Sequence, residues 1–272
     1  MISNLVTKNF SSKELKARAI YDWITQYISY DIKAGRNNDA SKSSTTEVLK
    51  FRKAIGAGYA NLFQDMCSSA NIRCLTVDGF IKKNIEEVGE TKAEINHTWA
   101  VVQLGQSPDT WFYVDPCWGA GFPDKKGTAY IKSFDDSYFF SDKRIFNNQH
   151  YPDNEAWKLG MAPKSKKEFY ELPVVKAGVH PFGITAFVPT QGKVKIKAGK
   201  SVAFNLTAAG TSDVTKVALI IENNRKFTEK VMNYSASGGH ITFEYKFSDE
   251  GEFPVLLKIN DKETLEYLVT VE

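Results

Sequence analysis

The second half of the chain is a series of short segments in which apolar and polar residues alternate. The segments are ITAFVP, KVKIKAG, SVAFNLTA, KVALIIEN, HITFEYKFS, FPVLLKIN and LEYLVTVE. Turn signals such as SASGG and SDEGE separate them. Alternation with a period of two is typical of strands that bury one face, and many such strands between regular turns favour a sandwich. We therefore expect an all-β sandwich of about 100 residues in this half.

The first half has a different pattern. Residues 11–30 open with a possible capping box, Ser11 with Glu14, and continue with apolar residues at helical spacing, which predicts a helix. The polar run 34–47 predicts a loop. A second helix is predicted to begin near Gly56 and to end near Asn71.

Extended segments follow this second helix. Residues 72–82, 96–104 and 110–118 read as strands, and the last two flank a short loop, so they predict a hairpin. Residues 134–160 are aromatic and irregular.

A lysine-rich stretch at residues 164–167 separates the two patterns. We place a domain boundary there, with a core domain at residues 1–165 and a β-sandwich domain at residues 166–272. Within the second domain, FSDEGEFPVLLKI resembles the turn into a late strand of an immunoglobulin-like domain. That resemblance implies an immunoglobulin-like sandwich.

Charge and hydropathy exclude some classes of partner. The chain has 35 basic and 32 acidic residues, a net charge of +3 without a clustered basic excess, so we expect no nucleic-acid partner. No apolar run approaches the roughly 20 residues that span a bilayer, so we expect no membrane span. The first residues lack the pattern of a signal peptide. This favours a cytoplasmic protein, or an exported one if the start of the chain has been trimmed.

Cysteine and histidine are sparse. Cys67, Cys74 and Cys117 are too few, and odd in number, for a disulfide framework, and they form no zinc-binding motif. The four histidines are scattered along the chain. No acidic cluster suggests calcium. We therefore expect neither a metal nor a cofactor.

The predicted hairpin pairs a histidine with an aspartate. If its loop is residues 104–108, Val101 lies opposite Trp111 and His97 lies opposite Asp115. Directly opposed side chains share a face of the sheet, with Cβ atoms about 4.5–5.5 Å apart. A carboxylate beside an imidazole fixes its tautomer and stabilises its protonated form.

Such a pair acts as a general base when a nucleophile lies beside it. A nucleophile at a helix N-terminus has its pKa lowered by unpaired N–H groups and the helix dipole. The helix predicted to begin near Gly56 would supply that position. Glycine, however, has no side chain to attack with.

Three segments together resemble the transglutaminase-like superfamily. They are AIGAGYANLF, HTW and WFYVDPCWG. The later run YFFSDKRIFNNQHYPDNEAWKLG and the segment EFYELP resemble the subgroup related to kyphoscoliosis peptidase. The resemblance covers about residues 15–175. It implies an α+β core that is papain-like and transglutaminase-like.

The resemblance implies acyl transfer by a cysteine thiolate, with His97 as base and Asp115 as its orienter. The nucleophile position falls on Gly56, where the superfamily carries cysteine. Tyr59 and Trp118 are expected to be core aromatics first, and Trp99 neighbours His97. All three are expected to contact the substrate.

Three interpretations stay open. The leading one is an inactive, pseudoenzyme member that binds a protein or peptide partner through the former cleft. The alternative is a cysteine peptidase, a hydrolase, or a protein-glutamine acyltransferase seen as a nucleophile-replaced variant, natural or engineered. A purely structural module is the third. Cys117 is the least implausible substitute nucleophile, and the oligomeric state is not predicted.

Overall fold

A computed structural model describes residues 2–124 and 126–272 of the chain. The chain forms two compact units. The first comprises Met1–Phe80, Glu94–Lys143 and Pro152–Gly160, and the second comprises Ile81–Ala93, Arg144–Tyr151 and Met161–Glu272. The boundary that we predicted between residues 165 and 166 stays a prediction.

The α-helices are α1 (Ile2–Thr7), α2 (Lys13–Tyr27), α3 (Ile32–Arg36), α4 (Thr45–Phe51), α5 (Gly56–Ser69), α6 (Lys143–Gln149) and α7 (Lys166–Glu171). The strands up to residue 175 are β1 (Ser29–Tyr30), β2 (Lys53–Ala54), β3 (Arg73–Ile81), β4 (His97–Gln103), β5 (Trp111–Val114), β6 (Gly121–Pro123), β7 (Tyr130–Lys132), β8 (His150–Pro152) and β9 (Val174–Val175). The later strands are β10 (Ile184–Val188), β11 (Lys193–Ile196), β12 (Ser201–Ala208), β13 (Val217–Asn223), β14 (Lys226–Val231), β15 (Ser235–Ser237), β16 (His240–Lys246), β17 (Gly251–Ile259) and β18 (Lys262–Val271).

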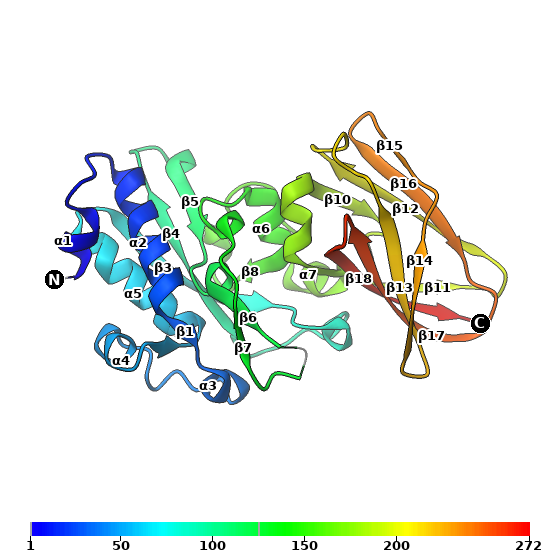
Figure 1. Ribbon diagram of the computed structural model, residues 1–272, viewed down its shortest axis with the longest axis horizontal. Coiled ribbons are helices and arrows are strands. Elements are labelled where there is room, and N and C mark those ends of the chain that lie inside the picture. The colour runs from blue at the N-terminus through cyan, green and yellow to red at the C-terminus, as the bar shows by residue number, and fades with distance from the viewer. Residues whose placement is uncertain (1, 125) are drawn as a thin grey trace. The chain divides into compact units, whose positions relative to one another are not determined.

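In the first unit, strand β4 is the centre of an antiparallel sheet in the order β5-β4-β3. All seven of its residues are buried, so both of its faces are covered. Helix α5 packs against β4, and α2 packs against α5 (Figure 1). Helix α5 buries the apolar side of an amphipathic sequence, including Tyr59, Leu62 and Phe63. This packing brings the first turn of α5 to the beginning of β4.

The structure corrects two local predictions about helices. The cap of α2 is Ser12 rather than Ser11, and its side chain accepts a hydrogen bond from the N–H of Leu15 at 3.2 Å. The run 34–47 is not one loop, because it ends inside helix α4. Ser44 caps that helix and accepts from the N–H of Glu47 at 3.3 Å.

The second unit contains two sheets, in the orders β10-β12-β16-β15 and β11-β18-β17-β13-β14, and β9 also pairs with β18. Figure 1 shows the strands of this unit from yellow to red. Strands β12 and β18 bury alternate residues, as the sequence predicts. One hydrophobic core joins residues of both sheets, among them Phe204 and Phe243 on one side and Leu257 and Tyr267 on the other.

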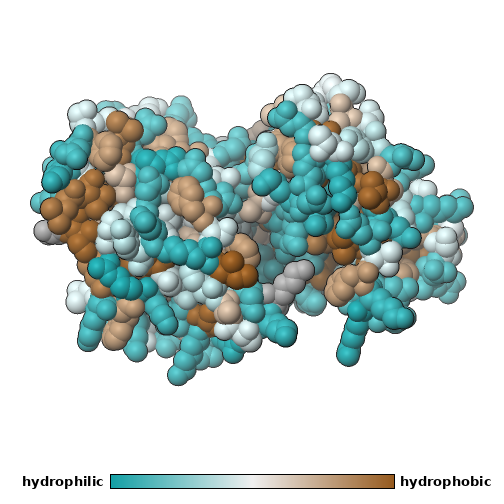
Figure 2. Space-filling model, viewed as in Figure 1, coloured by the Kyte–Doolittle hydropathy of each residue, from teal (hydrophilic) through white to brown (hydrophobic). Residues whose placement is uncertain are grey.

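The seven segments predicted as strands in this unit are strands, whereas β14 and β15 were not predicted. All six residues of β14 are exposed, so this strand lacks the alternation of buried and exposed residues by which the other strands were predicted. The visible surface of each unit is mostly hydrophilic with separate apolar spots (Figure 2). Among the described residues, no helix has the length and apolar character needed to cross a membrane.

Candidate functional site

Gly56 is the first residue of α5, as the sequence predicts, and it is buried. The preceding residue, Ile55, occupies the cap position and offers no side-chain hydrogen bond to the helix. A Cβ atom built on Gly56 would lie 2.6 Å from Nδ1 of His97, 2.8 Å from its Cε1 and 3.1 Å from the carbonyl oxygen of Thr98. The imidazole ring therefore occupies the space that any side chain at position 56 would need.

His97 and Asp115 form a buried pair. Nε2 of His97 lies 2.7 Å from Oδ2 of Asp115, and the two residues are 8% and 0% exposed. An ionised carboxylate only accepts hydrogen bonds, so Nε2 carries the hydrogen in this pairing. The other ring nitrogen, Nδ1, faces Gly56. The ring thus has the orientation that a general base beside a residue-56 nucleophile would need.

The pair forms although the predicted register was wrong. Val101 lies opposite Tyr113 rather than Trp111, which is a shift of two positions along β5. The loop includes a 3-10 helix at Pro108–Thr110, so β5 begins later than we expected. Strand β5 ends at Val114, and the chain then turns, which brings the Asp115 carboxylate back to His97.

The Asp115 carboxylate is held by a tight turn. Its Oδ1 accepts hydrogen bonds from the N–H groups of Cys117 at 2.9 Å and Trp118 at 3.0 Å. Its own N–H donates to the carbonyl oxygen of Tyr138 at 2.9 Å. Both carboxylate oxygens therefore have partners, which fixes the orientation of the group that orients His97.

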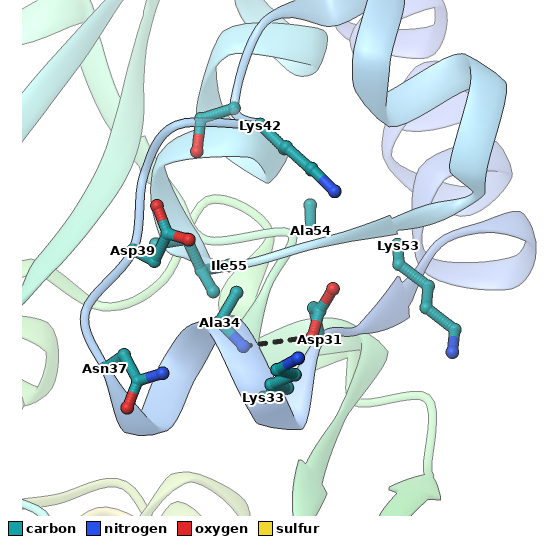
Figure 3. A pocket seen from close by; sticks show the side chains of 10 residues that line it. Asp31, Lys33, Ala34, Asn37, Asp39, Lys42, Lys53, Ala54 and Ile55 are labelled. Carbon is teal, nitrogen blue, oxygen red and sulfur yellow. Dashed lines mark hydrogen bonds between the residues drawn. The ribbon is translucent and has the colours of Figure 1, made fainter.

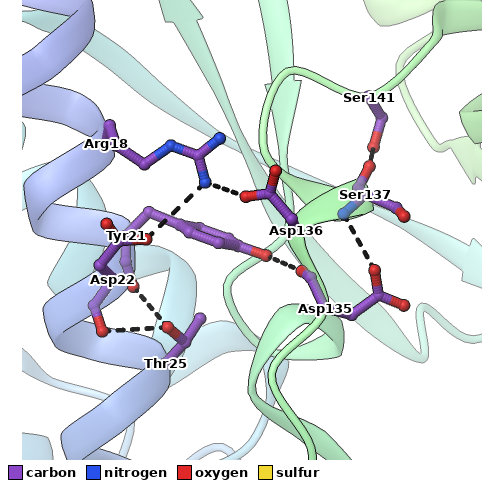
Figure 4. Close-up of polar contacts among 8 residues, drawn as sticks. All are labelled: Arg18, Tyr21, Asp22, Thr25, Asp135, Asp136, Ser137 and Ser141. Carbon is purple, nitrogen blue, oxygen red and sulfur yellow. Dashed lines mark hydrogen bonds and ion pairs between the residues drawn. The ribbon is translucent and has the colours of Figure 1, made fainter.

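Helix α2 contacts the end of this turn at Gly119 and the later segment at Asp135, which Figure 4 shows. The hydroxyl of Tyr21 donates to the carbonyl oxygen of Asp135 at 2.5 Å. A Cβ atom on Gly119 would overlap that hydroxyl oxygen, so a side chain at position 119 would displace the Tyr21 ring. Arg18 pairs with Asp136 and lies over the ring of Phe139.

Tyr21 is a residue of this site that sequence reasoning missed. Burial, followed by the negative charge of Asp115, raises the pKa of Tyr21 well above its usual value. In the sequence it occupies a helical position among apolar residues, so it reads as an ordinary core aromatic. No local signal ties it to Asp115, which lies far away along the chain.

The three expected aromatic contacts differ in burial. Trp118 is partly exposed, and its ring centroid lies 5.8 Å from that of His97. Trp99 stacks near His97 at 6.3 Å but is completely buried. Tyr59 is also completely buried and donates to the carbonyl oxygen of Ile28 at 2.9 Å. The expectation that Tyr59 and Trp99 contact a substrate does not fit this burial, since neither reaches the surface.

The cysteines are buried and free of disulfides. Burial, together with the nearby charge of Asp115, raises the pKa of the Cys117 thiol well above its usual value. Burial and then Cys74 raise the pKa of Cys67 in the same way. Because the thiolate is the reactive form, neither cysteine is suited to replace the missing nucleophile.

Comparison with known proteins identifies relatives. The sequence profile of the transglutaminase-like superfamily matches residues 1–116. The chain is 30% identical over 202 residues to kyphoscoliosis peptidase of Mus musculus and to that of Homo sapiens, with 74% of this chain and 30% of each relative covered. It is 27% identical over 233 residues to the Lim and transglutaminase domain protein ltd-1 of Caenorhabditis elegans, with 80% of this chain and 30% of that protein covered.

The chain therefore spans about 30% of the length of these relatives. The matched segment contains helix α5, strand β4 and Asp115, which are the elements that build the site. These matches place residues 1–116 in the transglutaminase-like superfamily, in a subgroup that resembles kyphoscoliosis peptidase.

Proposed function

We propose that this domain binds an extended segment of a protein or peptide and does not form an acyl-enzyme through residue 56. The observation that carries the proposal is Gly56 at the first turn of α5, directly beside the ring of His97. Acyl transfer by this route needs a thiolate at that point. Glycine supplies no atom that could attack a carbonyl carbon.

The packing around position 56 favours glycine over any residue with a side chain. The Cβ atom of cysteine, serine or alanine would come within 2.6 Å of Nδ1 of His97, which is much closer than van der Waals contact. The Asp115 hydrogen bond holds that ring at 2.7 Å on its other side. A larger residue would therefore displace the ring or strain its bond to Asp115.

Within this proposal, His97 and Asp115 stand where the base and its orienter would act in an active relative. Trp118 is the aromatic of the three that can contact a bound segment, because it is partly exposed. We further propose domain limits of 1–165 and 166–272 and an immunoglobulin-like sandwich for the second domain. Two sheets around one core support that architecture.

The absence of acyl transfer is tested with the wild-type chain. The measurement is incorporation of a fluorescent primary amine into a glutamine-containing protein, together with hydrolysis of a quenched peptide library. We expect neither rate to exceed that of the buffer. Turnover by the wild type that His97→Ala removes would overturn this half of the proposal.

Binding is tested separately with a display library of extended peptides that is not biased in charge or hydropathy. We expect selected peptides to bind the wild type and to protect Trp118 from quenching by iodide. Selection of no peptide, or selection only of peptides that leave Trp118 accessible, would overturn the binding half.

An enzyme is the second candidate, favoured by the preserved orientation of His97 towards position 56. Gly56→Cys discriminates the two candidates through its labelling rate with iodoacetamide at mildly acidic pH. We expect slow labelling, because the new Cβ atom must first displace the His97 ring. Rapid labelling that His97→Ala abolishes would favour the enzyme, since it requires a ring that activates the thiol.

A further inference from the structure

A groove in the first unit begins one residue before Gly56. Its larger part has a volume of about 790 Å³, and a smaller pocket of about 160 Å³ shares Asp31, Lys33, Asn37 and Lys53 with it. Ile55, which directly precedes Gly56, lines the smaller pocket. The larger volume is within the range of about 300–1,000 Å³ that ligand sites usually have. Figure 3 shows the smaller pocket and the side chains around it.

The walls of the groove are fixed by short contacts. A Cβ atom on Gly35 would overlap the hydroxyl oxygen of Tyr30, so α3 packs directly on β1. Arg36 donates to the carbonyl oxygen of Gly127 at 3.1 Å and 2.6 Å. Asp124 closes the adjoining turn by accepting from the N–H groups of Thr128 and Ala129. The groove is therefore formed before a ligand arrives, which lowers the entropic cost of binding.

The lining of the groove has an excess of positive charge. Four basic side chains line it, Lys33, Arg36, Lys42 and Lys53, against two acidic ones, Asp31 and Asp39. Both acidic groups are used locally. Asp31 accepts from the N–H of Ala34 at 3.0 Å, and Asp39 accepts from the N–H of Ser41 at 2.9 Å.

Arg36 is held by its hydrogen bonds to Gly127, and the ammonium group of Lys42 lies 5.2 Å from the centroid of the Phe51 ring. Among the described residues, Lys33, Lys42 and Lys53 form no ion pair within 4.0 Å. Lys42 extends over the smaller pocket towards Ala54 (Figure 3). The chain as a whole has a net charge of only +3, so this local excess is not a general property of the surface.

We infer that the groove binds an acidic peptide segment in extended form, with its carboxylates opposite Lys33, Lys42 and Lys53. The inference rests on the proposed function and names the chemistry of its partner. Strands β1 and β2 form the floor, with Lys53 paired in parallel to Ser29. Carboxylates bound there gain charge-assisted hydrogen bonds, which are stronger than those between neutral groups.

The test is fluorescence anisotropy of labelled short peptides with the full chain. One probe alternates glutamate and serine, a second replaces glutamate by glutamine, and a third replaces it by lysine. We expect the acidic probe to bind tightest. Added salt should weaken its binding, because the exposed basic side chains of the groove are screened over about 10 Å at 0.1 M ionic strength.

Charge reversal locates the binding. The double variant Lys33→Glu/Lys53→Glu should weaken binding of the acidic probe by about tenfold to a hundredfold, through like-charge repulsion. The matched control Lys197→Glu/Lys200→Glu changes the net charge equally at exposed positions of the second unit and should leave the affinity within about twofold. Inorganic phosphate at millimolar concentration should not displace the probe, since it occupies only one of several carboxylate sites.

The outcomes separate this inference from the proposed function. Equal weakening by both double variants would overturn the inference, because it would indicate only attraction by net charge. Tight binding of neutral or basic peptides that protect Trp118 would overturn the inference and leave the proposed function standing. Full displacement by phosphate would indicate a single-anion site instead of a peptide groove. If none of the three probes binds, the inference fails, and the library selection alone decides whether the proposed function fails as well.

Discussion

Two segments meet at the candidate site, and they are fixed in opposite ways. Residues 115–119 are fixed by directional bonds. Three N–H groups donate to the Asp115 carboxylate, those of His97, Cys117 and Trp118, and the N–H of Gly119 donates to the Asp115 carbonyl oxygen at 3.0 Å. Residues 54–58 carry no polar side chain and offer no side-chain cap.

The second segment is fixed by close approach. A Cβ atom on Gly56 would collide with His97, and one on Gly58 would lie 2.8 Å from Cβ of Ala54 and 2.9 Å from Cγ2 of Val48. Loss of a hydrogen bond should therefore destabilise residues 115–119, whereas an added side-chain atom should destabilise residues 54–58. The difference implies that substitutions on the two sides destabilise the unit for opposite reasons.

All five tryptophans lie in the first unit, so their fluorescence during urea unfolding reports on that unit.

The largest effect is expected from Asp115→Ala. This change leaves the His97 ring and two backbone N–H groups buried without their acceptor, which should lower the free energy of unfolding by about 3–5 kcal/mol. Asp115→Asn keeps an acceptor and should cost less. The control Asp109→Ala removes an exposed carboxylate and should stay within about 0.5 kcal/mol. A loss below about 1 kcal/mol for Asp115→Ala would contradict fixation by directional bonds.

Gly56→Ala tests the other side and should cost about 1–3 kcal/mol, because the added methyl group overpacks the contact with His97. The matched comparison is the same change in a His97→Ala background. There the ring is absent, so the cost of the methyl group should largely disappear. An equal cost in both backgrounds would show that the collision with His97 is not the cause.

Sequence patterns predicted the parts of the site that depend on local signals. Helix α5 begins at Gly56 as expected, and His97 and Asp115 pair as expected. The pairing survived an error in register because β5 ends at Val114 and the turn that follows, not the strand register, places the Asp115 carboxylate against His97. Strands such as β12 and β18 in the second unit were predictable because they bury alternate residues, whereas β14, which is exposed throughout, was not.

The remainder depends on contacts between distant residues or on signals that were misjudged. The support of Tyr21 for the turn at Asp115 has no local pattern, because the same residue would suit any buried helix face. Helix α4 was missed inside a polar run, although Ser44 and Glu47 form a recognisable cap. The burial of Tyr59 and Trp99 depends on how α5 packs on β4, which periodicity alone does not give.

Tyr21→Phe removes one bond behind the Asp115 turn and should cost about 1–2 kcal/mol, since it leaves the carbonyl oxygen of Asp135 without this donor. The control Tyr27→Phe changes a residue of the same helix that is 52% exposed. It should be neutral within about 0.5 kcal/mol. Equal effects from the two variants would show that the hydrogen bond of Tyr21 does not stabilise the turn at Asp115.

The smallest effect is a pH dependence from Cys117. Burial and then Asp115 raise the pKa of its thiol above the ordinary value of 9.0. The folded state therefore favours the neutral thiol, whose contribution is fully present below pH 9 and is lost as pH rises through the raised pKa. Between pH 7 and 9.5 this contribution should fall by about 1 kcal/mol or less, because only the unfolded thiol releases its proton there.

Cys117→Ser isolates this contribution, since serine does not ionise in that range. Between pH 7 and 9.5 the free energy of unfolding should fall more for the wild type than for the variant. The other titrating groups are common to both proteins, so their contributions cancel in this comparison. The sign follows from which state binds the proton more tightly, and here that is the folded one. A wild type that gains stability relative to Cys117→Ser as pH rises would mean that the turn stabilises a thiolate. That outcome would bring Cys117 back as a candidate nucleophile.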